Sequence, residues 1–305
     1  MPITTGSFAK ALWPGIAKWY GETYAEWPVE HTALFDQETS QKAFEQIVGI
    51  SGFGLAVEKA QGSGITYDTA SQAFITTATH KTYALGFILT EEAIDDNQYN
   101  IAALGKRDAK ALAFSMRQTM EILAANVYNR AFNSSYTFGD AKELCATDHP
   151  LFAGGTFANE LSTSADLSEA SLEQACIDIS NFENDRGLKI SVLPQSLIIS
   201  TDNAFEATRI LQSQLQNDSA NNAVNALRVM GAVPKGVKVN HYLTDSDAWF
   251  LRTNCPAGML QYNRKPTTFA PVENDFDTGN AKFKASFRVV FTCGDPRGIF
   301  GSPGA

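Results

Sequence analysis

Residues 52–89 read GFGLAVEKAQGSGITYDTASQAFITTATHKTYALGFIL, and this stretch decides the fold. Strand-like runs at 55–60 and 74–89 flank Gln61-Gly62-Ser63-Gly64, whose glycines let the backbone turn freely. The pattern predicts a long β-hairpin. Because the hairpin carries few large apolar side chains, it cannot form a core of its own, and we expect an interaction arm that projects from a compact domain.

A long amphipathic helix is predicted directly after the hairpin, over residues 101–131. Its apolar residues recur at spacings of three and four, which is the period of one helix face: Ala109, Leu112, Met116, Met120, Leu123, Val127 and Ala131. At 1.5 Å per residue the helix would be a rod of roughly 45 Å. The methionines allow a pliable binding face, but packing of this stripe against a sheet is the favoured interpretation.

The segment before the hairpin is unusually aromatic. Within residues 1–35 it holds Trp13, Trp19, Tyr20, Tyr24, Trp27 and Phe35, interrupted by Pro14, Gly15, Gly21 and Pro28. The interruptions argue against a long regular element, so we expect an extended arm. Its rings need a partner surface, either on their own chain or on a neighbour.

The remaining residues carry both helical and strand patterns, a mixed middle followed by strands, and the fold class that we expect for the whole chain is α+β. Helices are expected at 168–182 and, capped by Thr201-Asp202, at 201–215; residues 216–225 read as a surface loop. Strands are expected at 196–200, 237–239 and 248–251, and the last sixty residues read as all-β, ending in the clean alternation of 282–291.

Composition excludes several classes of protein. The chain has 305 residues and a formal net charge of -9, opposite in sign to a general nucleic-acid-binding surface. No run of eighteen apolar residues predicts a membrane span, and residues 1–10 lack a secretory signal. The four cysteines, Cys145, Cys176, Cys255 and Cys293, share no short spacing, so reduced and mostly buried thiols are expected.

Motifs that carry chemistry are scarce. The four histidines lie far apart, so no metal site and no cofactor are predicted. Asp148-His149-Pro150 could supply a catalytic histidine, but a simple turn is the favoured interpretation. Gly294-Asp295-Pro296-Arg297-Gly298 likewise reads as a turn, from which Arg297 could form an ion pair with another subunit. We therefore expect a protein that is not an enzyme.

The order of these elements resembles the Hong Kong 97-type capsid fold of tailed bacteriophages, and local sequence is similar to the Mu-like major head subunit group. The stretches that carry the resemblance are Tyr67-Asp68-Thr69-Ala70, residues 79–92 (THKTYALGFILTEE), Thr147-Asp148-His149-Pro150-Leu151 with Gly154-Gly155, and Cys293-Gly294-Asp295-Pro296-Arg297-Gly298. They extend over nearly the whole chain.

The resemblance implies an N-terminal arm at 1–50, an E-loop hairpin at 51–90, and a spine helix with the start of the P-domain at 91–134. An A-domain would occupy roughly 135–265, and returning P-domain strands 266–305. It also implies a major capsid protein that self-assembles, through pentamers and hexamers, into an icosahedral shell in the cytoplasm of the host bacterium.

Partners implied by the resemblance are other copies of the chain, a portal, a scaffold and possible decoration proteins. Packaged double-stranded DNA would lie against the inner face without sequence-specific binding, and no membrane is involved. The residues expected at contacts between subunits are Trp13, Trp19, Trp27, Lys59, Tyr67, Lys81 and Arg297. Some relatives crosslink an E-loop lysine to an asparagine, but no partner motif for Lys59 or Lys81 is identifiable.

Two rival functions belong to other classes. A nanocompartment shell built on the same fold would enclose a protein cargo and no DNA. A soluble hydrolase using His149 would be a monomer or small oligomer with measurable turnover.

Overall fold

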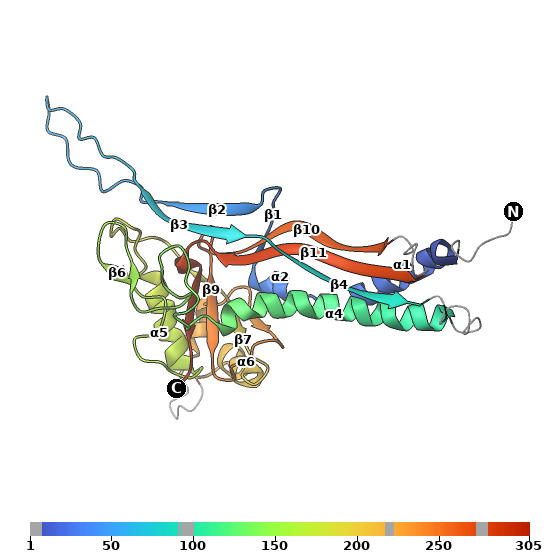
Figure 1. Ribbon diagram of the computed structural model, residues 1–305. Helices are drawn as coiled ribbons and strands as arrows, with labels where there is room; N and C mark the ends of the chain where they lie inside the picture. Colours follow the sequence, from blue (N-terminus) through green and yellow to red (C-terminus); the bar gives the residue numbers. More distant parts are fainter. Residues whose placement is uncertain (1–7, 91, 93–100, 217–222, 273–279) are drawn as a thin grey trace.

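A long sheet and one long helix form the axis of the molecule, and a second domain hangs beneath one end of them (Figure 1). The computed structural model describes residues 8–90, 92, 101–216, 223–272 and 280–305. The helices are α1 (Phe8–Glu26), α2 (His31–Leu34), α4 (Ile101–Asn129), α5 (Glu169–Ser180), α6 (Ala204–Gln212) and α7 (Ala226–Met230), with a 3-10 turn, η2, at Pro296–Gly298.

Two four-stranded sheets and two short hairpins complete the described secondary structure. The strands are β1 (Asp36–Thr39), β2 (Phe44–Ile50), β3 (Gln72–Thr79), β4 (Lys81–Leu89), β5 (His149–Pro150), β6 (Thr156–Phe157), β7 (Pro194–Ile199), β8 (Val237–Val239), β9 (Trp249–Thr253), β10 (Met259–Val272), β11 (Ala281–Cys293) and β12 (Ile299–Ser302).

The predicted long helix is confirmed as α4, which packs on the first sheet, whose strand order is β1-β10-β11-β4. Alternate residues of β11, among them Phe283, Ala285 and Phe287, are buried, as its alternating sequence predicts. They meet the apolar stripe of α4, including Leu112 and Met116. The apolar residues recur every three to four positions in α4 and every second position in β11. Each element therefore has one apolar face, and these two faces pack together as the core.

The second sheet, ordered β12-β9-β7-β8, forms the core of the hanging domain together with α5 and α6. Helix α5 confirms the helix expected at 168–182, and Ser168 caps it, its hydroxyl accepting a hydrogen bond from the backbone N–H of Ser171 at 3.2 Å. The expected Thr201-Asp202 cap is wrong, because α6 begins at Ala204 behind Asn203. Helix α7 was not expected, and residues 217–222 of the predicted surface loop lie outside the described part of the chain.

A third cluster of buried side chains joins the two sheets at the end of α4. Tyr128 lies at its centre, with its ring 5.6 Å from that of Phe35 and 5.3 Å from that of Phe250. The Tyr128 hydroxyl donates to the Leu34 carbonyl at 2.8 Å, which satisfies its one polar group. Rings from three distant segments therefore hold the domains in a fixed relation.

The expectation of an irregular N-terminal arm is wrong over Phe8–Glu26, where the chain forms helix α1 through Pro14, Gly15 and Gly21. Proline removes one N–H donor from the helix, a loss that packing can offset. That packing is against α4 and β10: Ile16 and Tyr20 are buried in the cluster between helix and sheet. The Tyr20 ring stacks on Phe269 with centroids 4.5 Å apart.

The segment after α1 is tied to α4 by a buried carboxylate. Glu121, fully buried, accepts hydrogen bonds from the His31 backbone N–H at 2.8 Å and from His31 Nδ1 at 2.7 Å. One carboxylate of α4 thus provides a hydrogen-bond acceptor for the backbone N–H in the first turn of α2 and for the histidine ring. From Phe8 to β1 the chain is therefore part of the folded subunit.

The predicted hairpin is present, but its strands differ from the expected ones. β2 and β3 pair in antiparallel register from Phe44 opposite Thr79 to Ile50 opposite Gln72. Residues 55–60 are not a strand in the subunit, and residues 51–71 extend beyond the paired strands as a long projecting loop (Figure 1). The turn at its tip closes as expected, with Gly62 at a φ of 84° and a hydrogen bond from Ser63 N–H to the Ala60 carbonyl.

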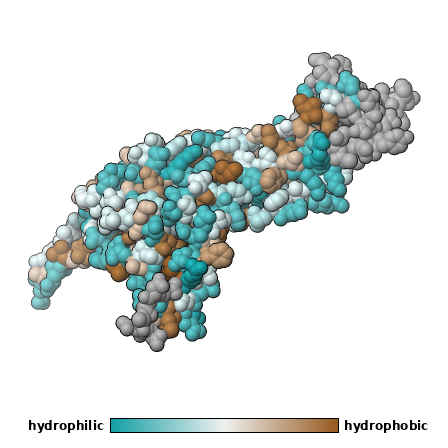
Figure 2. Space-filling view, turned by 90° about the horizontal axis from the view of Figure 1, so that it is seen from below, coloured by the Kyte–Doolittle hydropathy of each residue, from teal (hydrophilic) through white to brown (hydrophobic). Residues whose placement is uncertain are grey.

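The surface on the α4 side of the molecule is a mixture of polar and apolar residues with no broad apolar face (Figure 2). Among the described side chains of α4, which begin at Gly105, the exposed large apolar ones are Phe114 and Ile122. None of the helices in the described ranges has the length and hydropathy needed to cross a membrane.

A substitution at Trp19 tests how strongly the packing of α1 stabilises the subunit. The Trp19 ring packs beside the helix–sheet core and lies 5.7 Å from the Lys106 ammonium. Trp19→Ala should lower the free energy of unfolding by about 1–3 kcal/mol, since a half-buried aromatic is lost. The measurement is thermal unfolding of the unassembled subunit. Trp27→Ala, which removes a ring 42% exposed, is the comparison and should cost less; equal and negligible losses would mean that α1 does not hold to α4.

Candidate interaction surface

The projecting loop at residues 51–71 exposes more apolar surface than its sequence suggested. Its large apolar side chains are mostly in solvent: Tyr67 is 85% exposed, Leu55 79% and Val57 71%, and Phe53 and Ile65 exceed half. The expectation of few large apolar residues is therefore wrong for the tip. Apolar side chains gathered on one projection, with no core beneath them, mark a surface that binds a partner.

A single carboxylate holds the two sides of the loop together. Asp68 accepts hydrogen bonds at 2.8 Å from the backbone N–H of Gly54, on the rising side, and from that of Thr69, on its own side. The N–H of Gly54 is the main reason why the pKa of Asp68 lies below its usual value, with Thr69 contributing next. Asp68 therefore stays ionised at neutral pH and keeps both bonds.

Arg186, from the hanging domain, fixes this point of the loop to the body of the subunit. Its Nη2 donates to the Thr69 carbonyl at 2.7 Å and lies 3.5 Å from Asp68 Oδ1. The contact leaves the rest of the loop, including the turn at Gly62, without support from the body. The loop is anchored near its base and free at its tip.

The base of the hairpin fits against two glycines that leave no room for a side chain. A Cβ on Gly139 would lie 2.5 Å from Thr76 Oγ1 and 2.6 Å from the backbone of Ile75. A Cβ on Gly294 would lie 2.4 Å from the Ala257 carbonyl and 2.9 Å from Ile47. Both glycines also border a cavity of about 220 Å³ between the hairpin and the body. Close backbone approach sets the angle at which the hairpin leaves the molecule.

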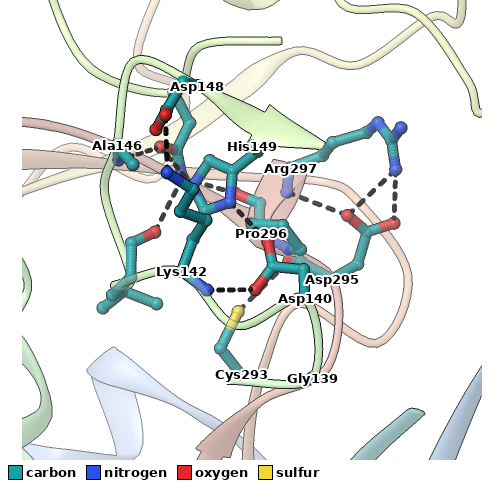
Figure 3. A network of polar contacts seen from close by, with 12 residues as sticks. Gly139, Asp140, Lys142, Ala146, Asp148, His149, Cys293, Asp295, Pro296 and Arg297 are labelled. Atoms are coloured by element: carbon teal, nitrogen blue, oxygen red, sulfur yellow. Dashed lines mark hydrogen bonds and ion pairs between the residues drawn. The ribbon is translucent and has the colours of Figure 1, made fainter. Parts of the chain in front are cut away.

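A buried polar network lies beneath this base, and it corrects the interpretation of Asp148-His149-Pro150 as a turn (Figure 3). His149 and Pro150 form strand β5, paired with β6, and the His149 side chain is fully buried. Its Nδ1 lies 2.5 Å from Asp140 Oδ2 and its Nε2 3.0 Å from Asn159 Oδ1. The imidazole also stacks on the Phe157 ring at 5.1 Å.

This geometry does not suit a catalytic histidine. A general base needs a free lone pair near the proton that it removes, whereas both nitrogens of His149 face oxygen acceptors. None of the hydrogen bonds that it makes among the described residues joins it to a serine, threonine or cysteine. The network is built for structure, because it fills the hydrogen-bonding capacity of a buried ring.

Arg297 completes the network from the far side of Phe157, with its guanidinium 4.6 Å from that ring. It is buried, and its Nη2 lies 2.9 Å from Asp185 Oδ1 while its Nε donates to the Glu183 carbonyl at 2.8 Å. The expected turn is present as η2. Its ion pairs, however, lie within its own chain, and we do not propose Arg297 as a contact between subunits.

The other predicted contact residues fall in three environments. Lys59 and Tyr67 lie on the exposed loop, and Lys81 is exposed at the start of β4. Trp27 is partly exposed beside Phe114, and Trp19 packs on its own chain. The side chain of Trp13 lies outside the described residues.

Sequence reasoning missed Arg186, Gly139 and Asp68 as parts of this surface. Asp68 lay within a stretch singled out for resemblance, but nothing local indicated its two backbone partners. Arg186 is 117 residues from Thr69 in the chain, and Gly139 is 63 residues from Thr76, so these contacts leave no local signal.

Comparisons with known proteins agree on one class. A family model described as phage capsid protein matches residues 74–301. A virus-like particle from Pyrococcus furiosus has a similar structure, with a TM-score of 0.52 and 10% identity over 95% of this chain and 98% of that chain. A structure of Mycobacterium phage Che8 scores 0.52 with 13% identity over 89% of each chain. The procapsid of bacteriophage JBD30 scores 0.51 with 13% identity over 98% of this chain and 76% of that chain. No curated protein sequence matches the chain significantly.

Gly139→Ala tests the close approach at the base of the hairpin. The added methyl group collides with backbone atoms that cannot move freely, so we expect a loss of about 1–3 kcal/mol in stability. Faster proteolysis within residues 44–79 should accompany the lower melting temperature. Gly64→Ala is the matched control, because a Cβ there meets nothing within 4 Å. Equal behaviour of the two variants would contradict the proposed fit.

His149→Ala tests whether the polar network is structural. Removing the ring takes the ion-pair partner from the mostly buried Asp140 carboxylate, which keeps only the hydrogen bond from the Lys142 backbone N–H, so stability should fall by roughly 3–5 kcal/mol. Asp148→Ala, in the same triplet, removes only an exposed ion pair with Lys142 and should cost less than about 1 kcal/mol. Chemical unfolding followed by circular dichroism measures both. If the His149→Ala protein folds with unchanged stability, the His149 network does not stabilise the fold and the structural role is contradicted.

Proposed function

This chain belongs to the phage capsid protein family and is a major capsid protein, and from that premise we propose that its hairpin is the main contact between subunits. The fold is the expected α+β, Hong Kong 97-type fold, shared with the phage structures named above. The similarity to the Mu-like group stays a prediction. Membership of a structural protein family favours a role without catalysis.

The observation that carries the proposal is the state of residues 51–71. The loop exposes Leu55, Val57 and Tyr67 to solvent although the subunit has a well-filled core elsewhere. Each such side chain gains about 1.5–3 kcal/mol when it is fully removed from water. A shell subunit recovers this free energy on assembly, in proportion to the area that its neighbours cover, less the cost of ordering the loop.

The division of the chain follows from the same proposal. We assign the N-terminal arm to 1–50, the E-loop to 51–90, and the spine helix with the start of the P-domain to 91–134. The A-domain takes 135–265 and the returning P-domain strands 266–305. The pairing of β2 with β3 adds that the rising strand of the E-loop begins at Phe44, inside the arm segment.

Assembly would proceed through pentamers and hexamers into an icosahedral shell, in the cytoplasm of the host bacterium, with portal, scaffold and decoration proteins as further partners. Double-stranded DNA would fill the shell. The net charge of -9 suits a container better than a nucleic-acid-binding protein, because an acidic surface makes few phosphate contacts. Lys59, Tyr67, Lys81 and Trp27, all at least partly exposed, are the proposed contacts with neighbours.

A nanocompartment enclosing protein cargo is the rival, because a virus-like particle shares this fold. The fold alone does not separate the two, whereas the match to the phage capsid family model favours the phage shell. Their contents differ. Particles isolated from infected cells should hold nuclease-protected double-stranded DNA, and particles filled with one protein species would favour the rival.

The exposed tip provides the test of the assembly mechanism. The purified chain should form shells visible by negative-stain microscopy, and the triple variant Leu55→Ser, Val57→Ser, Tyr67→Ser should remain as small soluble species. Because these side chains lie in solvent, the melting temperature of the variant subunit should change little.

The matched control replaces three exposed polar residues of the same loop: Glu58→Ser, Gln61→Ser and Thr66→Ser. This control should assemble like the original chain. Normal shells from the apolar variant, or loss of shells in both variants, would contradict an apolar contact at the tip.

A further inference from the structure

The strand β4 forms an unprotected edge of the first sheet. It pairs with β11 over nine residues, and no described strand pairs with its other side. At such an edge alternate N–H and C=O groups point outward without partners. The sequence of β4, KTYALGFIL, has no proline and no acidic residue, and Leu85 and Ile88 are about half exposed.

The opposite edge of the same sheet shows how such an edge is normally protected. That edge is β1, four residues long, fully exposed, and carrying Asp36 and Glu38. A short, charged edge strand discourages pairing with another chain, whereas a long, apolar one invites it. The sheet is therefore closed to further strands at β1 and open at β4.

Residues 55–59 of the projecting loop also lack backbone hydrogen bonds, and they could pair with such an edge. Their sequence, Leu-Ala-Val-Glu-Lys, predicts a strand, yet in the subunit they are fully exposed and make none of the backbone hydrogen bonds found among the described residues. The nearest backbone contacts are those of Gly54 with Asp68 and of Ala60 with Ser63. A segment with strand propensity is thus held open between two fixed points.

The two segments cannot meet within one subunit. The loop projects from one end of the molecule, and β4 runs along α4 toward the other end (Figure 1). Pairing between them therefore needs a second copy of the chain. A contact between two different surfaces of identical subunits is the kind that closes rings.

We propose that residues 55–59 of one subunit add as a strand to the free edge of β4 (Lys81–Leu89) in a neighbouring subunit. The inference rests on the proposed assembly into shells and names the surface that receives the loop. Backbone hydrogen bonds supply the pairing, and the exposed Leu55 and Val57 side chains cover Leu85 or Ile88. Pairing between two β4 edges would instead leave residues 55–59 without partners.

Hydrogen–deuterium exchange on assembled shells and on free subunits tests the pairing directly. In shells, backbone amides within residues 55–59 and those of alternate β4 residues should exchange about tenfold or more slowly than in the free subunit. Protection of β4 alone would indicate pairing between two β4 edges and overturn the proposal, as would protection of residues 55–59 alone. Shells in which neither segment is protected would overturn it while leaving the capsid function intact. The absence of any shell would count against the proposed function itself.

Val57→Pro is the matching variant, because proline removes one N–H and blocks a strand ladder. The Val57 N–H has no partner in the subunit, so folding should be unaffected, whereas shell yield should fall about tenfold or more. Gln61→Pro is the control, since Gln61 occupies the second position of the turn at Gly62, where proline is favoured. Normal shell yield from Val57→Pro, or an equal loss with Gln61→Pro, would overturn the proposal.

Discussion

The packing of α4 against one face of β11 is the interaction on which the rest of the structure depends. Alternate residues of β11 and one stripe of α4 bury each other, and α1 covers the same cluster from the other side. Because β11 pairs with both β10 and β4, this contact also positions the strands beside it. The hairpin follows directly, since β3 leads into β4 through His80 alone.

The layer beneath the base of the hairpin shows a second constraint, that buried polar groups need partners. The His149 ring and the Arg297 guanidinium both lie against the Phe157 ring. Each also finds an oxygen acceptor, Asp140 for His149 and Asp185 for Arg297. Such a network has few alternative arrangements, because one lost partner leaves a buried charge or donor unsatisfied. The base of the hairpin is therefore held at a defined angle by Gly139 and Gly294, next to this rigid layer.

A capsid subunit differs from a monomeric protein in the apolar side chains and unpaired backbone groups that it leaves exposed for other subunits. Here the core is complete, while one loop exposes apolar side chains and one sheet edge exposes backbone groups. The loop and the sheet edge both lie away from the core, so the subunit can fold before it assembles. Arg186 and Asp68 hold the loop near its base without covering its tip, which keeps the contact surface available.

The sequence by itself determined the elements whose pattern is local. The period of three to four residues predicted α4, the alternation of 282–291 predicted β11, and the glycines at 62 and 64 predicted the turn of the hairpin. The order of these elements also indicated the fold and the capsid family. Only the tertiary structure decided that α1 is a helix, since packing on α4 outweighs the cost of Pro14, and that residues 55–60 have no partner strand. It also decided that His149 and Arg297 are buried inside the subunit. The burial of His149 depends on how its short strand packs, and Arg297 contacts Glu183 and Asp185, which lie more than a hundred residues away and leave no local trace.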